Sequence, residues 1–203
     1  MANTEVLMYI HLLFNRLVYK LSRPSDWMAP VYRVHDPNAP PRPSVPVACT
    51  LPHGVMLGSS FDACSSDLFE SMDIRAVVNV TPDIPCFFRD KSVAYVRMSI
   101  DDNERSRFCT DMLQSASDFI TEQVRLGGQV LVHCVMGRSR SVCVCCYHFM
   151  KQHGMSFAEI YGLISVRRPQ VRVNQNFVHD LAREFPRDGS LQKFMSSSMV
   201  TCD

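Results

Sequence analysis

The segment from Val130 to Cys146, VLVHCVMGRSRSVCVCC, constrains the fold of this chain more than any other stretch. It begins as a continuous apolar run, which is typical of a strand buried on both faces of a parallel sheet. The run breaks into a short loop with one glycine and two arginines, and a second apolar run follows with the length of a helix. Because a buried guanidinium must be paired, the loop is expected to bind something negatively charged.

A strand that enters a helix through a tight loop predicts an anion site, since free backbone N–H groups and the helix dipole meet there. Gly137 allows the backbone to approach a ligand closely. Arg140 falls in the first helical turn, where its planar fork can hold two phosphate oxygens. Cys134 ends the strand, and the same positive field is expected to lower the pKa of its thiol. The loop is therefore predicted to place a nucleophile against the anion that it attacks.

The chain around this segment alternates short apolar strands with helical periodicities. Strands are expected over residues 54–60, 75–81, 93–100 and 129–134, and helices over 65–73, 109–128, 141–154, 156–169 and 174–185. Such alternation predicts an α/β domain with a mostly parallel central sheet flanked by helices. We assign residues 50–186 to this domain and residues 187–203 to a flexible C-terminal tail.

Residues 1–49 are predicted to form an N-terminal extension. The apolar run from Val6 to Leu21 is interrupted by Arg16 and Lys20, so it is too short to span a bilayer. Its charges follow the apolar stretch, which is the reverse of a signal peptide. We expect a helix whose apolar face packs on its own domain or on a second subunit, with a membrane surface or a partner as the alternative. The proline-rich stretch over residues 22–46 predicts an extended arm.

Composition narrows the class of protein further. Hydrophobic residues make up 46% of the 203 residues, as in a folded domain, and a net charge of +1 argues against a general nucleic-acid binder. Nine cysteines, an odd number, together with no secretory signal favour free thiols in a reducing compartment, the cytoplasm or nucleus. The cysteines at 143, 145 and 146 match no common zinc-finger spacing, so no metal and no cofactor is expected.

The motif HCVMGRSRS resembles the His-Cys-x5-Arg-Ser/Thr signature of the cysteine-dependent protein phosphatases. Its flanks are similar to the dual-specificity branch, in its small, atypical form. VMLGSSFDACSSDLFESMDIRAVVNVT resembles the opening strand-helix-strand of that branch, MSIDDN its acid loop and RRPQVRVNQNF its closing segment. The resemblance runs from about residue 51 to about residue 185. It implies a fold like that of protein tyrosine phosphatases, with a phosphate-binding loop between a strand and a helix.

The resemblance implies a role for each matching residue. Cys134 would be the nucleophile that forms a thiophosphate intermediate, Ser141 would bond its thiolate, and His133 would hold the loop and tune the cysteine. Asp102 would be the general acid, with the adjacent Asp101 as the alternative. The phosphate would be bound by the residues Val135, Met136, Gly137, Arg138, Ser139 and Arg140.

The closing segment and the loop also carry two departures from the family pattern. Asn174 matches a family asparagine that supports the loop, but Val173 stands where proline is common. Arg138 stands where a small apolar residue is usual. It is either a solvated charge on the rim or an additional cation for a polyanionic substrate.

The resemblance implies a metal-free phosphatase that hydrolyses phosphotyrosine and phosphoserine/threonine monoesters on proteins. The alternatives are a phosphoinositide or RNA 5′-phosphatase with the same loop, and a catalytically weak protein that binds phosphoproteins as a scaffold. The expected partner is a phosphoprotein substrate, with a kinase docked by the N-terminal arm as a further alternative, and no nucleic acid is expected. Whether Cys86 or another thiol forms a reversible disulfide with Cys134 is left open.

Overall fold

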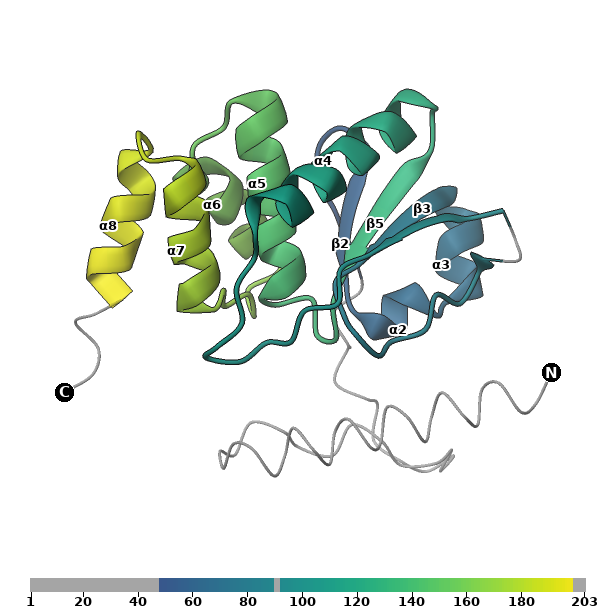
Figure 1. The fold of residues 1–203 in the computed structure, drawn as a ribbon. Helices are drawn as coiled ribbons and strands as arrows, with labels where there is room; N and C mark the ends of the chain where they lie inside the picture. The colour runs from purple at the N-terminus through teal and green to yellow at the C-terminus, as the bar shows by residue number, and fades with distance from the viewer. Residues whose placement is uncertain (1–47, 90–91, 199–203) are drawn as a thin grey trace, which may run out of the picture. The chain divides into compact units, whose positions relative to one another are not determined.

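The computed structural model describes residues 48–89 and 92–198 and is built on one five-stranded sheet (Figure 1). The strand order is β1-β2-β5-β3-β4; β1 is antiparallel to β2, and the other strands are parallel. The strands are β1 Cys49–Thr50, β2 Val55–Gly58, β3 Ile74–Asn79, β4 Ala94–Arg97 and β5 Gln129–His133. The α/β class and the mostly parallel central sheet predicted from the sequence are confirmed. The apolar helix and the proline-rich arm predicted within residues 1–47 lie outside the described residues.

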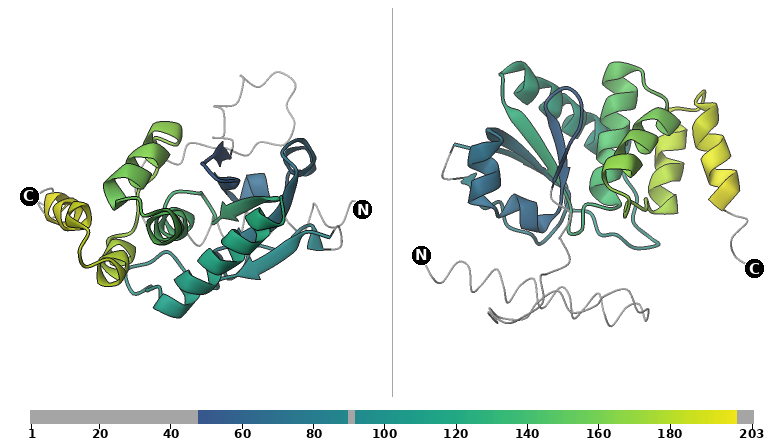
Figure 2. Two further views of the ribbon diagram at one scale, coloured as in Figure 1. Left: turned by 90° about the horizontal axis from the view of Figure 1, so that it is seen from above. Right: turned by 180° about the vertical axis from the view of Figure 1, so that it is seen from behind.

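Alternate residues of the strands form two cores, one on each face of the sheet. Val130 and Val132 of β5 point into the larger core, whereas Leu131 between them points into the smaller one. The helices over the larger core are α4 Thr110–Arg125, α5 Arg140–His153, α6 Phe157–Arg167 and α7 Gln175–Glu184. The short helices α2 Ser60–Ala63 and α3 Ser66–Ser71 cover the other face (Figure 2). A strand covered on both faces must be apolar throughout, which explains the sequence of β5.

Helix α5 is the central helix of the larger core. Every residue from Arg140 to Met150 is buried, and the helix ends at Gly154, whose φ of 64° suits glycine. The thiols of Cys143, Cys145 and Cys146 lie in this core, and burial raises the pKa of each. These cysteines are therefore packing residues that stay protonated.

The site lies where β5 ends and α5 begins. Residues 134–139 connect the two at the carboxyl end of the parallel strands, which is the usual ligand-binding edge of such sheets. The chain after β4 and the start of α7 contact the same loop through hydrogen bonds of Asp102 and Asn174 with Ser139.

The prediction of a flexible tail over residues 187–203 is wrong for most of that range. Helix α8 spans Gly189–Ser198, and Leu191 has an exposed fraction of 0%. The ring of Phe194 packs at 5.1 Å from the rings of Phe157 and Tyr161 in α6. The serine-rich sequence hid this helix because only one of its faces is apolar. No described helix has the length and hydropathy needed to cross a bilayer.

Candidate active site

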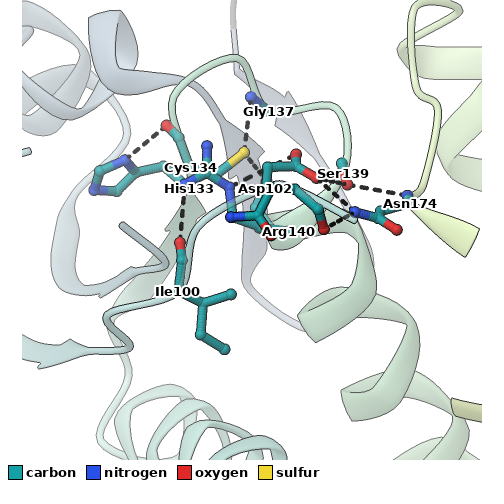
Figure 3. A network of polar contacts seen from close by, with 10 residues as sticks. Ile100, Asp102, His133, Cys134, Gly137, Ser139, Arg140 and Asn174 are labelled. Atoms are coloured by element: carbon teal, nitrogen blue, oxygen red, sulfur yellow. Dashed lines mark hydrogen bonds and ion pairs between the residues drawn. The ribbon is translucent and has the colours of Figure 1, made fainter. Parts of the chain in front are cut away.

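Cys134 lies directly after β5 with its sulfur at the centre of the loop (Figure 3). The Sγ atom accepts a hydrogen bond from the Gly137 N–H at 3.2 Å and from the Ser141 hydroxyl at 3.3 Å. Burial by itself would raise the pKa of this thiol. The Arg140 guanidinium, the Ser141 hydroxyl and backbone N–H groups outweigh burial and lower the pKa below its ordinary value. The site therefore favours a thiolate, which is the nucleophilic form of cysteine.

Each carbonyl oxygen of residues 134–139 accepts a hydrogen bond from a group outside the loop, and we infer from these partners that the carbonyls face outward. The Cys134 carbonyl accepts from His133 Nδ1, and the Val135 carbonyl accepts from N and Oγ of Ser60. The carbonyls of Met136 and Gly137 accept from Nη2 and Nε of Arg168. Those of Arg138 and Ser139 accept from the backbone N–H groups of Arg172 and Cys143. Because the N–H of a trans peptide points opposite to its carbonyl, outward carbonyls turn the N–H groups inward. The loop thus presents a ring of backbone donors around the sulfur, as an anion cradle requires.

Arg140 is buried beside this ring at the start of α5. Its Nη1 donates to the Ile100 carbonyl at 3.0 Å, while its Nε lies 3.7 Å from Asp102 Oδ2. That Nε makes no hydrogen bond within residues 48–89 and 92–198, although it is buried. A buried donor without an acceptor costs about 1–3 kcal/mol, and an oxyanion above Cys134 would supply the missing acceptor.

Asp102 faces the phosphate loop, whereas Asp101 is exposed. Asp102 Oδ1 accepts hydrogen bonds from Ser139 Oγ at 3.0 Å and from Asn174 Nδ2 at 3.3 Å (Figure 3). The Asp102 side chain is 23% exposed, so it is both held by the protein and open to solvent. This position suits a group that exchanges protons with a bound substrate and with water.

Asn174 connects three segments of the site. It caps α7, its backbone N–H donates to Ser139 Oγ at 3.1 Å, and its side-chain amide donates to the Asn103 carbonyl at 3.0 Å and to Asp102. The structure therefore brings Asn174 to the place where the acid loop meets the phosphate loop. Val173, the departure from the family pattern, does not displace it.

His133 is fully buried at the end of β5 and its Nδ1 lies 3.2 Å from the Cys134 carbonyl. Burial, followed by the nearby charges of Arg97 and Arg140, lowers its pKa to about 4 even though the Cys134 carbonyl favours protonation. The imidazole is therefore neutral near pH 7. Its position allows it to orient the loop by a hydrogen bond from Nδ1 and not by a positive charge.

The remaining loop residues differ in exposure. Met136 is exposed, while Arg138 is half-buried and its Nε donates to the Gln170 carbonyl at 2.7 Å. One nitrogen of the Arg138 guanidinium therefore binds the segment between α6 and α7. Its role toward a polyanionic substrate stays a prediction.

Sequence reasoning missed two residues that hold the loop. Ser60, in α2, binds the Val135 carbonyl through its N–H and its hydroxyl. Arg168, which follows α6, binds the carbonyls of Met136 and Gly137. The only sequence signal for Arg168 is its place in the RRPQVRVNQNF segment, where it looks like a surface charge.

All cysteines within the described residues are free thiols, and Cys86 Sγ accepts from Arg97 Nη2 at 3.4 Å. In the described ranges, no three His, Cys, Asp or Glu side chains gather as metal ligands would.

The family model of the dual specificity phosphatase catalytic domain matches residues 55–185. The chain belongs to this family. The catalytic domain is thus that of a cysteine-dependent protein phosphatase of the protein-tyrosine-phosphatase class, and the sequence resemblance is confirmed.

Known relatives support the same assignment. The chain is similar to dual specificity protein phosphatase 1B of Arabidopsis thaliana, with 34% identity over 128 residues, which cover 63% of this chain and 75% of that protein. It is 32% identical over 132 residues to dual specificity protein phosphatase Mpk3 of Drosophila melanogaster; these residues are 64% of this chain but only 32% of Mpk3. The crystal structure of human DUSP28 superposes with a TM-score of 0.63 at 27% identity, covering 76% of this chain and 97% of that one.

Proposed function

We propose that this protein hydrolyses phosphotyrosine and phosphoserine/threonine monoesters on proteins through a thiophosphate on Cys134. The observation that carries the proposal is the position of the Cys134 sulfur, which receives hydrogen bonds from Gly137 and Ser141 inside a ring of backbone N–H groups. The relatives are named dual specificity protein phosphatases, which supports phosphoproteins as the substrate class.

The first step transfers the phosphoryl group to sulfur. The Cys134 thiolate attacks phosphorus, the bond between phosphorus and the ester oxygen breaks, and a proton from Asp102 neutralises the leaving oxygen. The inward N–H groups and the Arg140 guanidinium bind the equatorial oxygens, where charge develops in the transition state.

The second step returns the enzyme to its resting state. The Asp102 carboxylate takes a proton from a water molecule, the water oxygen attacks phosphorus, and the phosphorus–sulfur bond breaks to release inorganic phosphate. The Ser141 hydroxyl, 3.3 Å from Sγ, stabilises the departing thiolate.

Two other functions use the same loop. A phosphoinositide or RNA 5′-phosphatase would need additional cations at the rim, and Arg138 is there but is engaged with the Gln170 carbonyl. A scaffold protein without catalysis would lack the cysteine, the arginine or the acid, and the chain has all three as Cys134, Arg140 and Asp102. The N-terminal extension as a kinase-docking or subunit contact, and a cytoplasmic or nuclear location, belong to the same proposal.

The test is release of phosphate from a small aryl phosphate by purified protein in the presence of a metal chelator. Wild type should turn over, and Cys134→Ser should lower kcat/KM by about a thousand-fold or more, because the nucleophile is lost. A folded wild type that binds a phosphotyrosine peptide but releases no phosphate would contradict the proposal and support the scaffold function.

A further inference from the structure

Arg168 is a buried charge next to the phosphate loop that the mechanism above does not use. It follows α6, is 1% exposed, and is among the largest fully buried side chains of the described residues. Its Nε donates to the Gly137 carbonyl at 2.8 Å and its Nη2 donates to the Met136 carbonyl at 3.0 Å. The guanidinium therefore binds two consecutive peptide units of the loop from their outer side.

Those two peptide units carry the donors that face the sulfur. The Met136 carbonyl shares its peptide with the Gly137 N–H, which lies 3.2 Å from Cys134 Sγ. The Gly137 carbonyl shares its peptide with the Arg138 N–H, and this N–H helps to lower the pKa of Cys134. Both peptides are trans, so a carbonyl fixed outward fixes its N–H inward.

The packing around Gly137 leaves little freedom for another arrangement. Gly137 has a φ of +63°, and a Cβ atom there would lie 2.7 Å from Arg168 Nη2 and 2.4 Å from the Gly58 carbonyl oxygen. The loop is thus in direct contact with the guanidinium on one side and with the end of β2 on the other.

We propose that Arg168 is a positioning residue that turns the Gly137 and Arg138 N–H groups toward Cys134 by holding the Met136 and Gly137 carbonyls. Arg168 acts through the backbone and prepares the anion cradle before substrate arrives. The inference rests on the proposed function, since it assigns a role within that site.

The two hydrogen bonds, and not the charge alone, carry this role. After burial, the groups that determine the pKa of Cys134 are Arg140, the Ser141 hydroxyl, and the N–H groups of Ser141 and Arg138. The field of Arg168 instead opposes the burial-driven rise in the pKa of Cys49 in β1. A lysine at this position would keep the positive charge but lose the planar fork that spans two carbonyls.

The experiment measures the rate at which iodoacetate alkylates Cys134 between pH 5 and pH 9, with mass spectrometry to identify the labelled residue. Arg168→Met, Arg168→Lys and wild type are compared with and without inorganic phosphate, and thermal unfolding is recorded for each. Arg167→Met is the matched control, because Arg167 is exposed and its removal changes the net charge equally.

We expect Arg168→Met to shift the alkylation profile to higher pH, with about tenfold slower labelling at pH 6 and about tenfold weaker protection by phosphate. Arg168→Lys should recover only part of the loss, and Arg167→Met should match wild type. If Arg168→Met does not fold, the alkylation profile and phosphate protection of Arg168→Lys are compared with those of wild type and test the inference alone.

Two outcomes would overturn the inference. The first is a lower unfolding temperature with an unchanged alkylation profile, which would make Arg168 a stabilising residue only. The second is full recovery by Arg168→Lys, which would assign the effect to charge. Neither alkylation nor phosphate protection needs turnover, so a failure here is distinct from a failure of the phosphatase activity.

Discussion

Cys134 and the cysteines of α5 show how strongly one residue depends on its neighbours. Burial is the main cause that raises the pKa of Cys143, Cys145 and Cys146. Burial acts on Cys134 in the same direction, but Arg140 and the surrounding donors reverse the result. Cys134 is therefore predicted to be a reactive thiol, whereas the three cysteines of α5, in the same strand-loop-helix segment, are inert core residues.

The proposed general acid, Asp102, should matter more for a poor leaving group than for a good one. Asp102→Ala should lower kcat for an alkyl phosphate by about 100-fold or more, because an alkoxide cannot leave without a proton. An aryl phosphate with an acidic phenol should lose far less. Steady-state rates on the two substrates check this.

The neighbouring carboxylate provides the control for that prediction. Asp101 is exposed, so Asp101→Ala should leave both rates close to those of wild type. An equal loss on both substrates in Asp102→Ala, or a larger loss in Asp101→Ala, would show that Asp102 is not the acid.

At the scale of elements, the phosphate loop owes its shape to segments far from it in sequence. Ser60 of α2 holds one carbonyl, Arg168 after α6 holds two, and Arg172 holds another. The segment of Asn174 joins the same loop to the loop of Asp102. The loop is thus a shared product of β5, α5, α2 and the connection between α6 and α7.

Gly137 is the position where this arrangement tolerates change least. Gly137→Ala places a side chain at a φ of +63° and against the Gly58 carbonyl, so backbone strain of about 1–2 kcal/mol adds to a direct clash. We expect phosphate binding, measured as protection of Cys134 from iodoacetate, to weaken by about tenfold or more.

A second glycine makes the matched comparison. A Cβ at Gly162 in α6 meets no other side chain of the described residues within 4 Å, so Gly162→Ala should keep phosphate binding and raise the unfolding temperature slightly. If both variants bind phosphate as wild type does, the loop is more tolerant than its packing indicates.

At the scale of the whole described domain, two buried histidines link stability to pH. Burial is the main cause that lowers the pKa of His133 and of His148 to about 4. His148 also faces His153 and His53, whose charges lower its pKa further, and Ser117, whose contact raises it. Both imidazoles are therefore neutral in the folded protein down to about pH 5.

This difference predicts a loss of stability in acid. The unfolded chain binds a proton on each histidine near its ordinary pKa, whereas the folded protein does not until the pH approaches 4. The contribution of each neutral histidine to the free energy of unfolding is thus complete above about pH 6.5. It is lost as the pH falls toward 4, by on the order of 2 kcal/mol per histidine at pH 5. Urea unfolding at pH 7 and pH 5 measures it.

Two asparagine variants separate this effect from general acid denaturation. His148→Asn removes one titrating group and should reduce the difference in unfolding free energy between pH 7 and pH 5. His179→Asn, at an exposed position of α7, should leave that difference unchanged. Identical differences in both variants would contradict the assignment to His148.

Three features could be predicted from the amino-acid sequence alone: the α/β class, Cys134 as the candidate nucleophile and Arg140 as the arginine of the loop. Cys134 and Arg140 stand in the contiguous stretch Val130–Cys146, in which an apolar strand, a polar loop and an apolar helix have local signatures, and the α/β class follows from the alternation of such strands and helices along the domain. Helix ends that depend on a local residue could also be predicted, as at Gly154, which ends α5. The position of Asp102 followed only from similarity to a family motif.

The packing of the whole fold was needed to show which distant residues complete the site and which polar stretches are partly buried. Ser60 lies 75 residues from the carbonyl that it holds, and Arg168 lies 31 residues from Gly137. No local pattern marks such pairs, because a hydrogen bond across the fold depends on how whole elements pack. The same reason explains α8, since the apolar face that includes Leu191 becomes a helix-stabilising surface only when α6 and α7 are in place to cover it.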